Sequence, residues 1–323
     1  MSGSQLSGRH CLVTGGAGFI GSHVASKLLE QGAYVTVLDN FSTGFEANLT
    51  AIRQVDGEHR LTFHQTDAAD PAAVSIAMEG IDYVFHLAAM ASVPRSMREP
   101  ELCHAWTATS TVVLLQAALA ARVKRFVLSS TSAVYGDSTF VSKRESDPVA
   151  PLSPYAAAKL ASENYLAAFQ KMGLETVTLR YFNVFGPRQD PQSEYSAVIP
   201  RFVSLVLDGK RPIVYGDGEQ SRDFVHVDDV VAVNLAAATH PNAPGGVFNV
   251  GRGESTTLLQ LLDELRGLMG KTIDPDFQPA RAGDVRQSLA DISLLRNRLG
   301  FEPSVSMADG LHDSIAYYRS LFE

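Results

Sequence analysis

The feature that most constrains the fold is a run of glycines in residues 12–21. An apolar stretch, Cys11–Val13, precedes the run and has the character of a buried parallel strand, and a helical pattern begins after it. Gly15, Gly18 and Gly21 follow one another at intervals of three residues. A glycine-rich turn between a buried strand and a helix directs backbone N–H groups to one point, where they favour a phosphate group.

Each glycine of this loop has its own expected role, and a later carboxylate indicates the nucleotide. Gly15 permits the tight turn, Gly18 lets a pyrophosphate approach the backbone, and Gly21 lets the helix pack closely on the strand. A second strand, residues 34–38, ends at Asp39, where a carboxylate would bind adenosine ribose hydroxyls and repel a 2′-phosphate. The segment predicts an NAD site. The alternative is a purely structural turn followed by an ordinary acidic loop start.

Strand and helix patterns alternate through the first half of the chain. Strands are expected at residues 11–14, 34–38, 61–65, 82–87 and 125–129, and helices at about 19–31, 70–78, 99–121 and 154–172. This alternation predicts an α/β fold in which helices cover both faces of a parallel sheet. Ligands of such sheets bind beyond the carboxyl ends of the strands, so the loops that follow the strands are the informative ones.

The alternation fades after about residue 180, where proline and glycine turns become frequent. The chain has 323 residues, which is long for one simple domain. We expect residues 1–180 to form the nucleotide-binding domain, with about 224–250 returning to it. Residues 181–323 are expected to form a smaller, mixed α/β domain that holds a substrate over the sheet.

Composition and charge exclude several classes of function. The formal net charge of -8 gives no basic surface for nucleic acid and no polybasic patch for a membrane. Residues 1–8 lack the apolar segment of a signal peptide, and no run of 18 apolar residues is present, so we expect a cytoplasmic protein. Cys11 and Cys103 are expected to be reduced packing residues. The histidines show no ligand spacing, and no metal site is expected.

The sharpest catalytic signal is the pair Tyr155 and Lys159, which project from one face of a predicted helix. A free tyrosine, with a pKa of about 10, is a poor base at neutral pH. A lysine cation one turn away stabilises the phenolate and lowers that pKa. With the hydroxyl cluster Ser129–Ser132 at a strand end, the pair predicts that Tyr155 removes a hydroxyl proton while hydride leaves the same carbon. A surface tyrosine and lysine on an exposed helix are the alternative.

A series of motifs resembles the extended short-chain dehydrogenase/reductases that act on nucleotide sugars. In chain order the motifs are TGGAGFIG, DNFSTG, HLAA, SSTSAVYGD, SPYAAAK, LRYFNVFGPR and RAGD. The resemblance covers residues 9 to about 320. It implies a Rossmann-type, doubly wound parallel sheet, a retained NAD and a C-terminal domain for a nucleotide sugar.

The resemblance carries roles over to individual residues. Tyr155 and Lys159 match the catalytic pair, and Thr131 matches the hydroxyl that bonds the reacting group, with Ser132 as a substitute. The residues expected around NAD are Gly15, Gly18, Phe19, Ile20, Gly21, Asp39, Asn40, Ser42, Thr43, Gly44, Asp67, Ala68, Leu87, Ala88, Ala89, Ser129, Tyr155, Lys159, Tyr181 and Val184. Thr107 departs from the family pattern, because an asparagine is common there.

The residues after Thr131 bear on the reaction. Resembling 4,6-dehydratases have Asp and Glu at the next two positions, and decarboxylases and some dehydratases have Ser and Glu. This chain has Ser132 and Ala133, so neither position carries a carboxylate. That absence favours oxidation at C4, rotation of the 4-keto sugar and return of the hydride to its opposite face, which yields the C4 epimer.

Residues 91–96, 183–191, 195–200 and 216–224 are similar to bacterial UDP-N-acetylglucosamine 4-epimerases of surface-polysaccharide pathways. The substrate residues that the resemblance implies are Ser92, Arg95, Thr131, Ser132, Asn183, Ala197, Val198, Phe202, Tyr215, Arg222, Arg281, Asp284 and Ser288. The expected substrate pair is UDP-N-acetylglucosamine and UDP-N-acetylgalactosamine. UDP-glucuronate, with Arg188 near its C6 carboxylate, and UDP-glucose are the alternatives. A cofactor-binding regulator without catalysis is a further alternative, which the intact catalytic residues disfavour.

The helix pattern at residues 112–121 is apolar almost all round and must be covered on both sides. One side would pack on the sheet and the other on a second subunit. The family resemblance points to a four-helix interface that includes the helix of Tyr155, with Leu160, Leu166, Ala167 and Phe169 offering a partner face. We therefore expect a homodimer.

Overall fold

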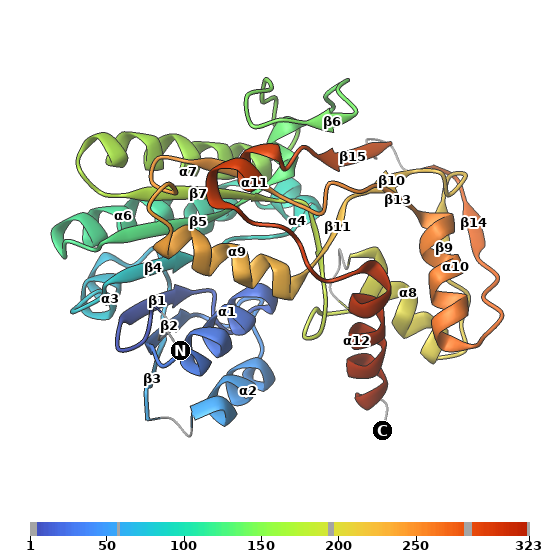
Figure 1. The fold of residues 1–323 in the computed structure, drawn as a ribbon, viewed down its shortest axis with the longest axis horizontal. Helices are drawn as coiled ribbons and strands as arrows, with labels where there is room; N and C mark the ends of the chain where they lie inside the picture. Colours follow the sequence, from blue (N-terminus) through green and yellow to red (C-terminus); the bar gives the residue numbers. More distant parts are fainter. Residues whose placement is uncertain (1–4, 57–58, 193–196, 281–285, 322–323) are drawn as a thin grey trace.

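The computed structural model describes the chain apart from residues 1–4, 57–58, 193–196, 281–285 and 322–323. Its main sheet has seven strands, and every pair of neighbours is parallel (Figure 1). In spatial order they are β12 (Val247–Val250), β7 (Thr176–Tyr181), β5 (Arg125–Thr131), β4 (Tyr83–His86), β1 (His10–Thr14), β2 (Tyr34–Asp39) and β3 (Leu61–Gln65). The strand order reverses between β1 and β4, which is where such sheets bind ligands. The Rossmann-type sheet is confirmed.

Helices cover both faces of this sheet (Figure 1). The helices of the first half are α1 (Phe19–Glu30), α2 (Glu46–Asp56), α3 (Pro71–Ala77), α4 (Val93–Arg98), α5 (Pro100–His104), the π-helix η1 (Ala105–Thr109), α6 (Ser110–Ala120), the 3₁₀ turn η2 (Ser132–Tyr135) and α7 (Pro154–Lys171). Those of the second half are α8 (Val198–Leu207), α9 (Val227–Thr239), α10 (Leu258–Met269), α11 (Ser293–Leu299) and α12 (Met307–Ser320).

Alternate residues of the central strands build two separate core clusters. On β1, Cys11 and Val13 pack with residues of α1 and α9, whereas Leu12 packs with residues of α3, α6 and α7. Side chains of a strand alternate between the two faces of a sheet, so a strand that is covered on both faces must be apolar throughout. This explains the unbroken apolar run before the glycines.

The second half of the chain contributes to the main sheet. β12 pairs with β7 at the sheet edge, and α9 packs against α1. In the other direction β6 (Ser142–Lys143), from the first half, joins a smaller sheet of order β13-β10-β15-β6. The other strands of that sheet are β13 (Thr256–Thr257), β10 (Ser221–Arg222) and β15 (Gln287–Ala290). The two parts of the chain therefore interleave, and a division at residue 180 remains a proposal.

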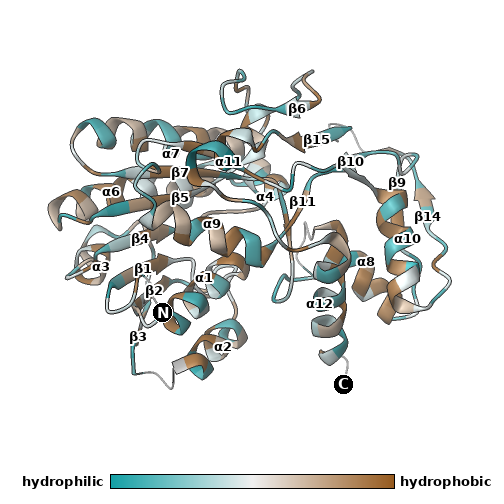
Figure 2. Cartoon of the chain, viewed as in Figure 1, coloured by the Kyte–Doolittle hydropathy of each residue, from teal (hydrophilic) through white to brown (hydrophobic). Residues whose placement is uncertain are grey.

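The remaining strands and helices form a third cluster beside the main sheet. β11 (Phe224–His226) pairs with β8 (Asn183–Phe185), and β14 (Asp276–Gln278) pairs with β9 (Ile213–Tyr215). α8, α10 and α12 pack together there, and α10 buries Leu258, Leu261, Leu262 and Leu265. This spacing places the leucines on one side of the helix. Figure 2 shows both apolar and polar residues on α10 and α12.

The long helix expected at residues 99–121 is a rod of three segments, α5, η1 and α6. By length and composition the rod, Pro100–Ala120, could cross a membrane, but 44% of its apolar window is buried in the fold. It packs against α3 and α7. Val112 of α6 is half-buried, and Tyr165 of α7 is exposed.

The expected partner face on α7 is wrong in two of its four residues. Leu166 is 1% exposed and Phe169 is 8% exposed, and both pack in the cluster on the α6 side of the sheet. The sequence pattern could not distinguish this cluster from a subunit interface, because both demand apolar residues at helical spacing. Ala167 is exposed and Leu160 is half-buried.

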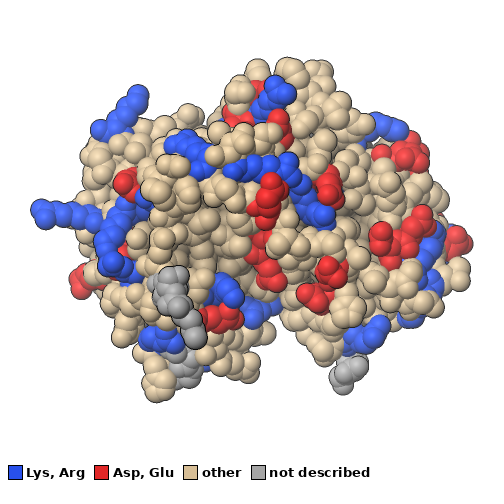
Figure 3. Space-filling view, in the orientation of Figure 1, with Lys and Arg blue, Asp and Glu red and all other residues tan. Residues whose placement is uncertain are grey.

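Charges of both signs are interspersed on the face in Figure 3, with a row of Lys and Arg side chains near α11. On α11 itself, Arg296 forms an ion pair of 2.8 Å with Glu302. Basic side chains of this face thus lie beside acidic ones rather than forming one extended field.

Candidate active site

The glycine loop joins β1 to α1 as the sequence predicts. Gly15 has a φ of +70°, and a Cβ there would lie 2.8 Å from the backbone nitrogen of Ala88. Gly18 is the N-cap of α1, and a Cβ on Gly21 would collide with the carbonyl of Gly15. Gly15 and Gly21 are thus fixed by close approach of the backbone. The first N–H groups of α1, from Phe19 and Ile20 onward, begin at this loop.

Asp39, at the end of β2, is tied to the glycine loop. One carboxylate oxygen accepts a hydrogen bond from the backbone N–H of Ala17 at 2.9 Å, and the other accepts one from Phe41 at 2.8 Å. The side chain is buried, and burial raises its pKa. Gly44 packs against it, because a Cβ there would lie 3.0 Å from a carboxylate oxygen of Asp39. The carboxylate is therefore held in place before any ligand arrives.

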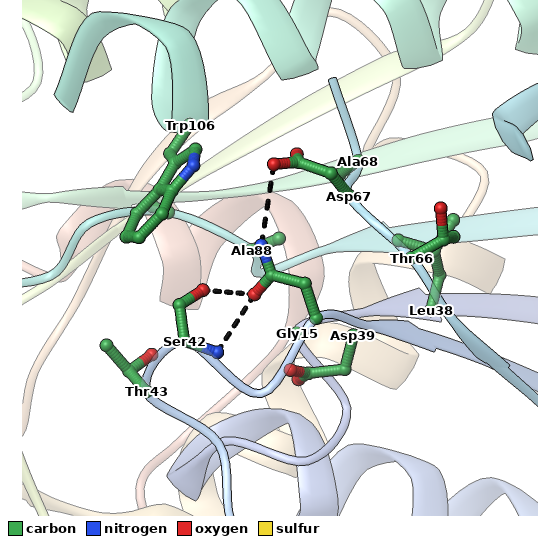
Figure 4. A pocket seen from close by; sticks show the side chains of 12 residues that line it. Gly15, Leu38, Asp39, Ser42, Thr43, Thr66, Asp67, Ala68, Ala88 and Trp106 are labelled. Atoms are coloured by element: carbon green, nitrogen blue, oxygen red, sulfur yellow. Dashed lines mark hydrogen bonds between the residues drawn. The ribbon is translucent and has the colours of Figure 1, made fainter. Parts of the chain in front are cut away.

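A pocket of about 390 Å³ opens above Asp39 (Figure 4). Its lining residues are Gly15, Leu38, Asp39, Asn40, Ser42, Thr43, Thr66, Asp67, Ala68, Ala88, Ala89 and Trp106. Nine of these are among the expected cofactor residues, and Leu38, Thr66 and Trp106 were not predicted. Trp106 is the single tryptophan of the chain, and this is the only feature by which the sequence marks it.

The pocket wall is organised by short polar contacts. The Oδ1 atom of Asn40 accepts hydrogen bonds from the backbone N–H and the hydroxyl of Ser42. The amide of Asn40 donates to Asp67 at 3.4 Å, and Asp67 in turn accepts from the backbone N–H of Ala69. Gly15 has no Cβ and so leaves room for a ligand, and Asp39 offers a fixed carboxylate for a ribose. This combination fits the adenosine half of NAD.

Tyr155, the tyrosine that the sequence predicts to be catalytic, lies in the first turn of α7. Ser153 caps this helix, because its hydroxyl accepts a hydrogen bond from the N–H of Ala156 at 3.2 Å. The Tyr155 side chain is close enough to that of Thr131, the last residue of β5, for the two to interact electrostatically. Burial raises the pKa of Tyr155 to about 12, while the nearby Thr131 side chain lowers it. Ser132 begins the turn η2, so Thr131 rather than Ser132 meets the tyrosine here.

Lys159 lies one turn after Tyr155 and is 2% exposed. Its ammonium donates a hydrogen bond of 2.6 Å to the backbone carbonyl of Ser129. Burial lowers the pKa of Lys159 to about 8, and Glu163 opposes that shift. Glu163 is itself engaged by Arg180 at 2.7 Å and by the hydroxyl of Ser130. The Glu163 carboxylate therefore has a structural role, and its negative charge stabilises the Lys159 cation.

A buried chain of hydroxyls and one imidazole supports the catalytic helix. His86 bonds Thr14 at 2.7 Å through Nδ1 and Thr111 at 3.0 Å through Nε2. The Thr111 hydroxyl also contacts Ser162 of α7 at 3.0 Å. Burial, followed by the charge of Lys159, holds the pKa of His86 well below its ordinary value. A neutral ring thus links the ends of β1 and β4 to α6 and α7.

Thr107 stands at a position where the family commonly has asparagine, and it makes contacts through its hydroxyl and its carbonyl. Its hydroxyl accepts a hydrogen bond from the backbone N–H of Met90 at 3.4 Å. Its carbonyl accepts hydrogen bonds from Thr111 and Ser162. A π-helix leaves carbonyls of the ordinary ladder unpaired, and side-chain hydroxyls occupy this one. The structure thus gives Thr107 a backbone-holding role.

The side chain of Tyr181 lies in the core, and a cofactor contact of this residue stays a prediction. Its side chain is buried at 6% exposure, and its hydroxyl is paired with Asn234 of α9. At the end of β7, only the backbone of Tyr181 is left for contact with a cofactor. Val184, in β8, packs against the core cluster to which Tyr181 belongs. Leu87 and Ala88 lie at the end of β4, where their N–H groups donate to the carbonyl and hydroxyl of Thr14.

Two further residues from the sequence analysis lie in packed positions. Arg188 donates a hydrogen bond of 3.2 Å to Ser26 on the third turn of α1, and its φ is +65°. It therefore holds the loop after β8 against α1. Phe202 is 2% exposed and belongs to the core between α8, α10 and α12, and its contact with a nucleotide stays a prediction.

The structure brings some of the other substrate residues together. Arg222 of β10 and Ser288 of β15 are register partners in neighbouring parallel strands. Asn183 donates its N–H to the carbonyl of Asp223 at 3.0 Å, one residue after Arg222. Ser92 caps α4 by accepting from the N–H of Arg95 at 3.3 Å.

The remaining expected substrate residues are more scattered. Tyr215 ends β9, Ala197 precedes α8 and Val198 begins it. Arg281 and Asp284 lie outside the described residues. The structure therefore gives no position for two of the polar groups that the family resemblance assigns to the nucleotide.

The NAD pocket and the catalytic pair are neighbours. Trp106 and Tyr155 both pack against a buried cluster of Met90, Cys103, Ala108 and Ala158. A parallel sheet with a dinucleotide pocket beside a tyrosine and a lysine one turn apart defines an NAD-dependent enzyme of the short-chain dehydrogenase/reductase class. Residues 11–251 match the model of the NAD dependent epimerase/dehydratase family, and the chain belongs to this family. Its cofactor is NAD.

Known proteins of similar sequence and structure cover the whole chain. It is 37% identical over 312 residues to a UDP-glucose 4-epimerase of Mycolicibacterium smegmatis, covering 96% of this chain and 98% of that protein. It also resembles the solved UDP-N-acetylglucosamine 4-epimerase of Methanobrevibacter ruminantium, with a TM-score of 0.92, 39% identity and coverage of 98% and 99%. A UDP-glucuronic acid 4-epimerase of Bacillus cereus, solved with NAD, has a TM-score of 0.89, 33% identity and coverage of 97% and 99%.

Proposed function

We propose that the protein interconverts UDP-N-acetylglucosamine and UDP-N-acetylgalactosamine. It is an NAD-dependent UDP-sugar 4-epimerase, and the choice of sugar is the part that we propose. The observation that carries the reaction type is the placement of Tyr155 and the buried Lys159 on α7 against the end of β5, where neither Ser132 nor Ala133 supplies a carboxylate.

Tyr155 and Lys159 have different roles in the proton transfer. When NAD is bound, it supplies the acceptor for the hydride of C4 and returns that hydride later. Tyr155 takes the proton of the C4 hydroxyl, and the nearby cation of Lys159 stabilises the phenolate. Thr131, beside the tyrosine, orients the reacting hydroxyl. After the 4-keto sugar has rotated, Tyr155 returns the proton on the other face.

Loss of water or carbon dioxide needs further acids and bases, and the site does not provide them at the expected positions. Dehydration must deprotonate C5 and protonate the departing C6 hydroxyl. Glu163 lies close to Lys159 but is held by Arg180 and Ser130. Both oxygens of this carboxylate already accept hydrogen bonds from these partners, so Glu163 does not serve as the additional acid or base. Simple epimerisation is therefore the reaction that the geometry supports.

The substrate proposal draws on three observations. The UDP-N-acetylglucosamine 4-epimerase structure is the relative with a TM-score of 0.92. Residues 91–96 and 183–191 resemble that group of enzymes. Arg188, which the glucuronate alternative placed at a C6 carboxylate, is bound to Ser26 instead. UDP-glucose remains the second candidate, because a relative that is 37% identical carries that name.

A panel of UDP-N-acetylglucosamine, UDP-glucose and UDP-glucuronate tests the proposal, with products identified by proton NMR. We expect the N-acetylated sugar to be epimerised with the highest kcat/KM. Epimerisation of UDP-glucose or UDP-glucuronate alone would overturn the choice of sugar. A new C6 methyl doublet or a lost carboxylate would overturn the reaction type.

A further inference from the structure

We propose that Trp106, held in place by Arg95, forms the outer wall of the adenosine pocket and slows the dissociation of NAD. None of the family motifs of the sequence contains Trp106. It is the single tryptophan of the chain, and its side chain lines the NAD pocket opposite Asp67 and Ala68 (Figure 4).

The position of Trp106 depends on the π-helix in which it lies. Residues Ala105–Thr109 form one wide turn between α5 and α6. The hydroxyl of Ser110 donates to the carbonyls of Trp106 and Thr107 at 2.8 Å and 3.2 Å, which satisfies groups that the regular ladder leaves open. The wide turn is thus stabilised by side chains, and it changes the direction of Trp106 relative to the residues of α6.

Arg95 clamps the indole from the side of α4. The guanidinium carbon of Arg95 lies 5.0 Å from the centre of the Trp106 ring, within the range of a cation–π contact. Glu99, one turn later on the chain, holds the guanidinium at 3.2 Å. The ring therefore has a fixed orientation, and its position does not require the cofactor to induce it.

The wall that Trp106 provides is suited to a nucleoside. On the other sides the pocket offers the polar groups of Asp39, Asn40 and Ser42, and the small residues Ala88 and Ala89. An indole supplies a large, rigid apolar surface at little entropic cost and restricts the access of water to the ribose and base. Such a wall acts after binding, so its main effect is on the dissociation rate.

Arg95 has a different role here from the substrate contact that the sequence resemblance implies. The sequence resemblance assigns Arg95 to the substrate, whereas in the structure its guanidinium contacts Glu99 and Trp106. Through Trp106, Arg95 supports the cofactor pocket as a positioning residue. Tyr155 packs on the same buried cluster as Trp106, so the wall also adjoins the catalytic helix.

The experiment measures how fast purified enzyme loses its NAD on dilution, with the released nucleotide separated and quantified. Trp106→Ala should lose NAD about tenfold faster than the unmodified protein, and Trp106→Phe, which keeps a ring, about threefold faster. Leu102→Ala is the matched control, because Leu102 packs on the same cluster without lining the pocket. It should lose NAD at the unmodified rate.

Two outcomes would overturn the proposal: loss of NAD from Trp106→Ala at the unmodified rate, or equal acceleration by Leu102→Ala. A second measurement uses the unmodified protein and needs no folded variant. Since Trp106 is the single tryptophan, its fluorescence reports on the pocket directly. Removal of NAD should change the emission and its return should restore it. Emission that is the same with and without NAD would contradict contact between the indole and the cofactor.

Discussion

The ammonium of Lys159 donates a hydrogen bond of 2.6 Å to the backbone carbonyl of Ser129. This contact joins the catalytic helix α7 to the end of β5, so the sheet itself sets the distance between Lys159 and Thr131. Because Ser129 contributes its carbonyl, its side chain does not determine the contact. Burial of the lysine lowers its pKa to about 8, which leaves the cation dependent on the charge of Glu163.

Replacement of Tyr155 by Phe should lower turnover by roughly 10² to 10⁴, the usual range for one acid–base group. The NAD content of the purified protein should stay nearly unchanged, since Tyr155 does not line the adenosine pocket. Tyr34→Phe is the control, because Tyr34 is 43% exposed at the start of β2, at the end of the sheet remote from the site. Near-normal turnover of Tyr155→Phe would remove this residue from the mechanism.

NAD should co-purify with the protein and should not be needed in the assay. The physical reason is that an epimerase returns its hydride in each cycle, and the pocket holds Asp39 and the glycine loop in place beforehand. Denaturing the protein after gel filtration and quantifying the released nucleotide checks this. Full activity of a protein without bound NAD(H) would be incompatible with it.

Replacement of Glu163 by Gln should destabilise the protein by about 3–5 kcal/mol, because it leaves the buried cation of Arg180 without its partner. The same change should lower the pKa of Lys159 further, since Glu163 raises it. The alkaline limit of activity should then move to lower pH. Urea unfolding and a pH–rate profile measure the two effects. Glu302→Gln, in the exposed pair with Arg296, should cost less than about 1 kcal/mol.

His23 should make the protein less stable in acid. Burial lowers its pKa to about 4 from 6.5, and its Nε2 hydrogen-bonds the carbonyl of Pro187. Between these two values the unfolded chain binds the proton more readily, so this contribution to stability is present above pH 6.5 and is lost as pH falls toward 4. The loss between pH 7 and pH 5 is on the order of 1–2 kcal/mol.

Comparing urea midpoints at those two pH values for His23→Gln isolates this contribution. The variant should show a weaker pH dependence than the unmodified protein. His312→Gln, whose parent side chain is 75% exposed, is the control and should retain the full dependence. An unchanged pH slope in His23→Gln would contradict the assignment.

The protein should be a homodimer at micromolar concentration, with α7 and the outer side of α6 at the interface. Tyr165 is 45% exposed on α7, and Val112 of α6 is half-buried. Light scattering should give twice the monomer mass, and Tyr165→Asp should shift the population toward monomer. Leu268→Asp, at a 37% exposed site on α10, is the control. A monomer mass for the unmodified protein would show that these helices stay uncovered.

The sequence predicted the parts of the molecule where one residue type is required by local geometry. Gly15 has a left-handed backbone, Asp39 ends a strand, and Tyr155 and Lys159 are one turn apart, and all three patterns are visible in the chain. The nine expected residues of the NAD pocket follow from loops at strand ends. Such features depend on neighbours in sequence and are therefore accessible without a structure.

Features that depend on packing between distant segments were missed or misassigned. Tyr181 is the last residue of β7, yet its side chain pairs with Asn234 of α9 in the core. Arg188 turns toward Ser26, which is distant in sequence. Trp106 lines the pocket from a π-helix that no periodicity in the sequence marks, and Arg95 of α4 lies over its ring. In each case the partner that decides the side-chain position comes from another part of the chain.

The pairing of β12 with β7 also bears on how the molecule is made. A ribosome has to synthesise residues 181–246, including α8, β9 and α9, before the last strand of the NAD sheet can join its edge. Until then β7 presents an unpaired edge, and the apolar side of α1 lacks α9. The nucleotide sheet is thus completed only after residues 181–246 of the second part of the chain have been translated. A fragment ending at residue 180 is consequently a poor choice as a transplantable NAD-binding module.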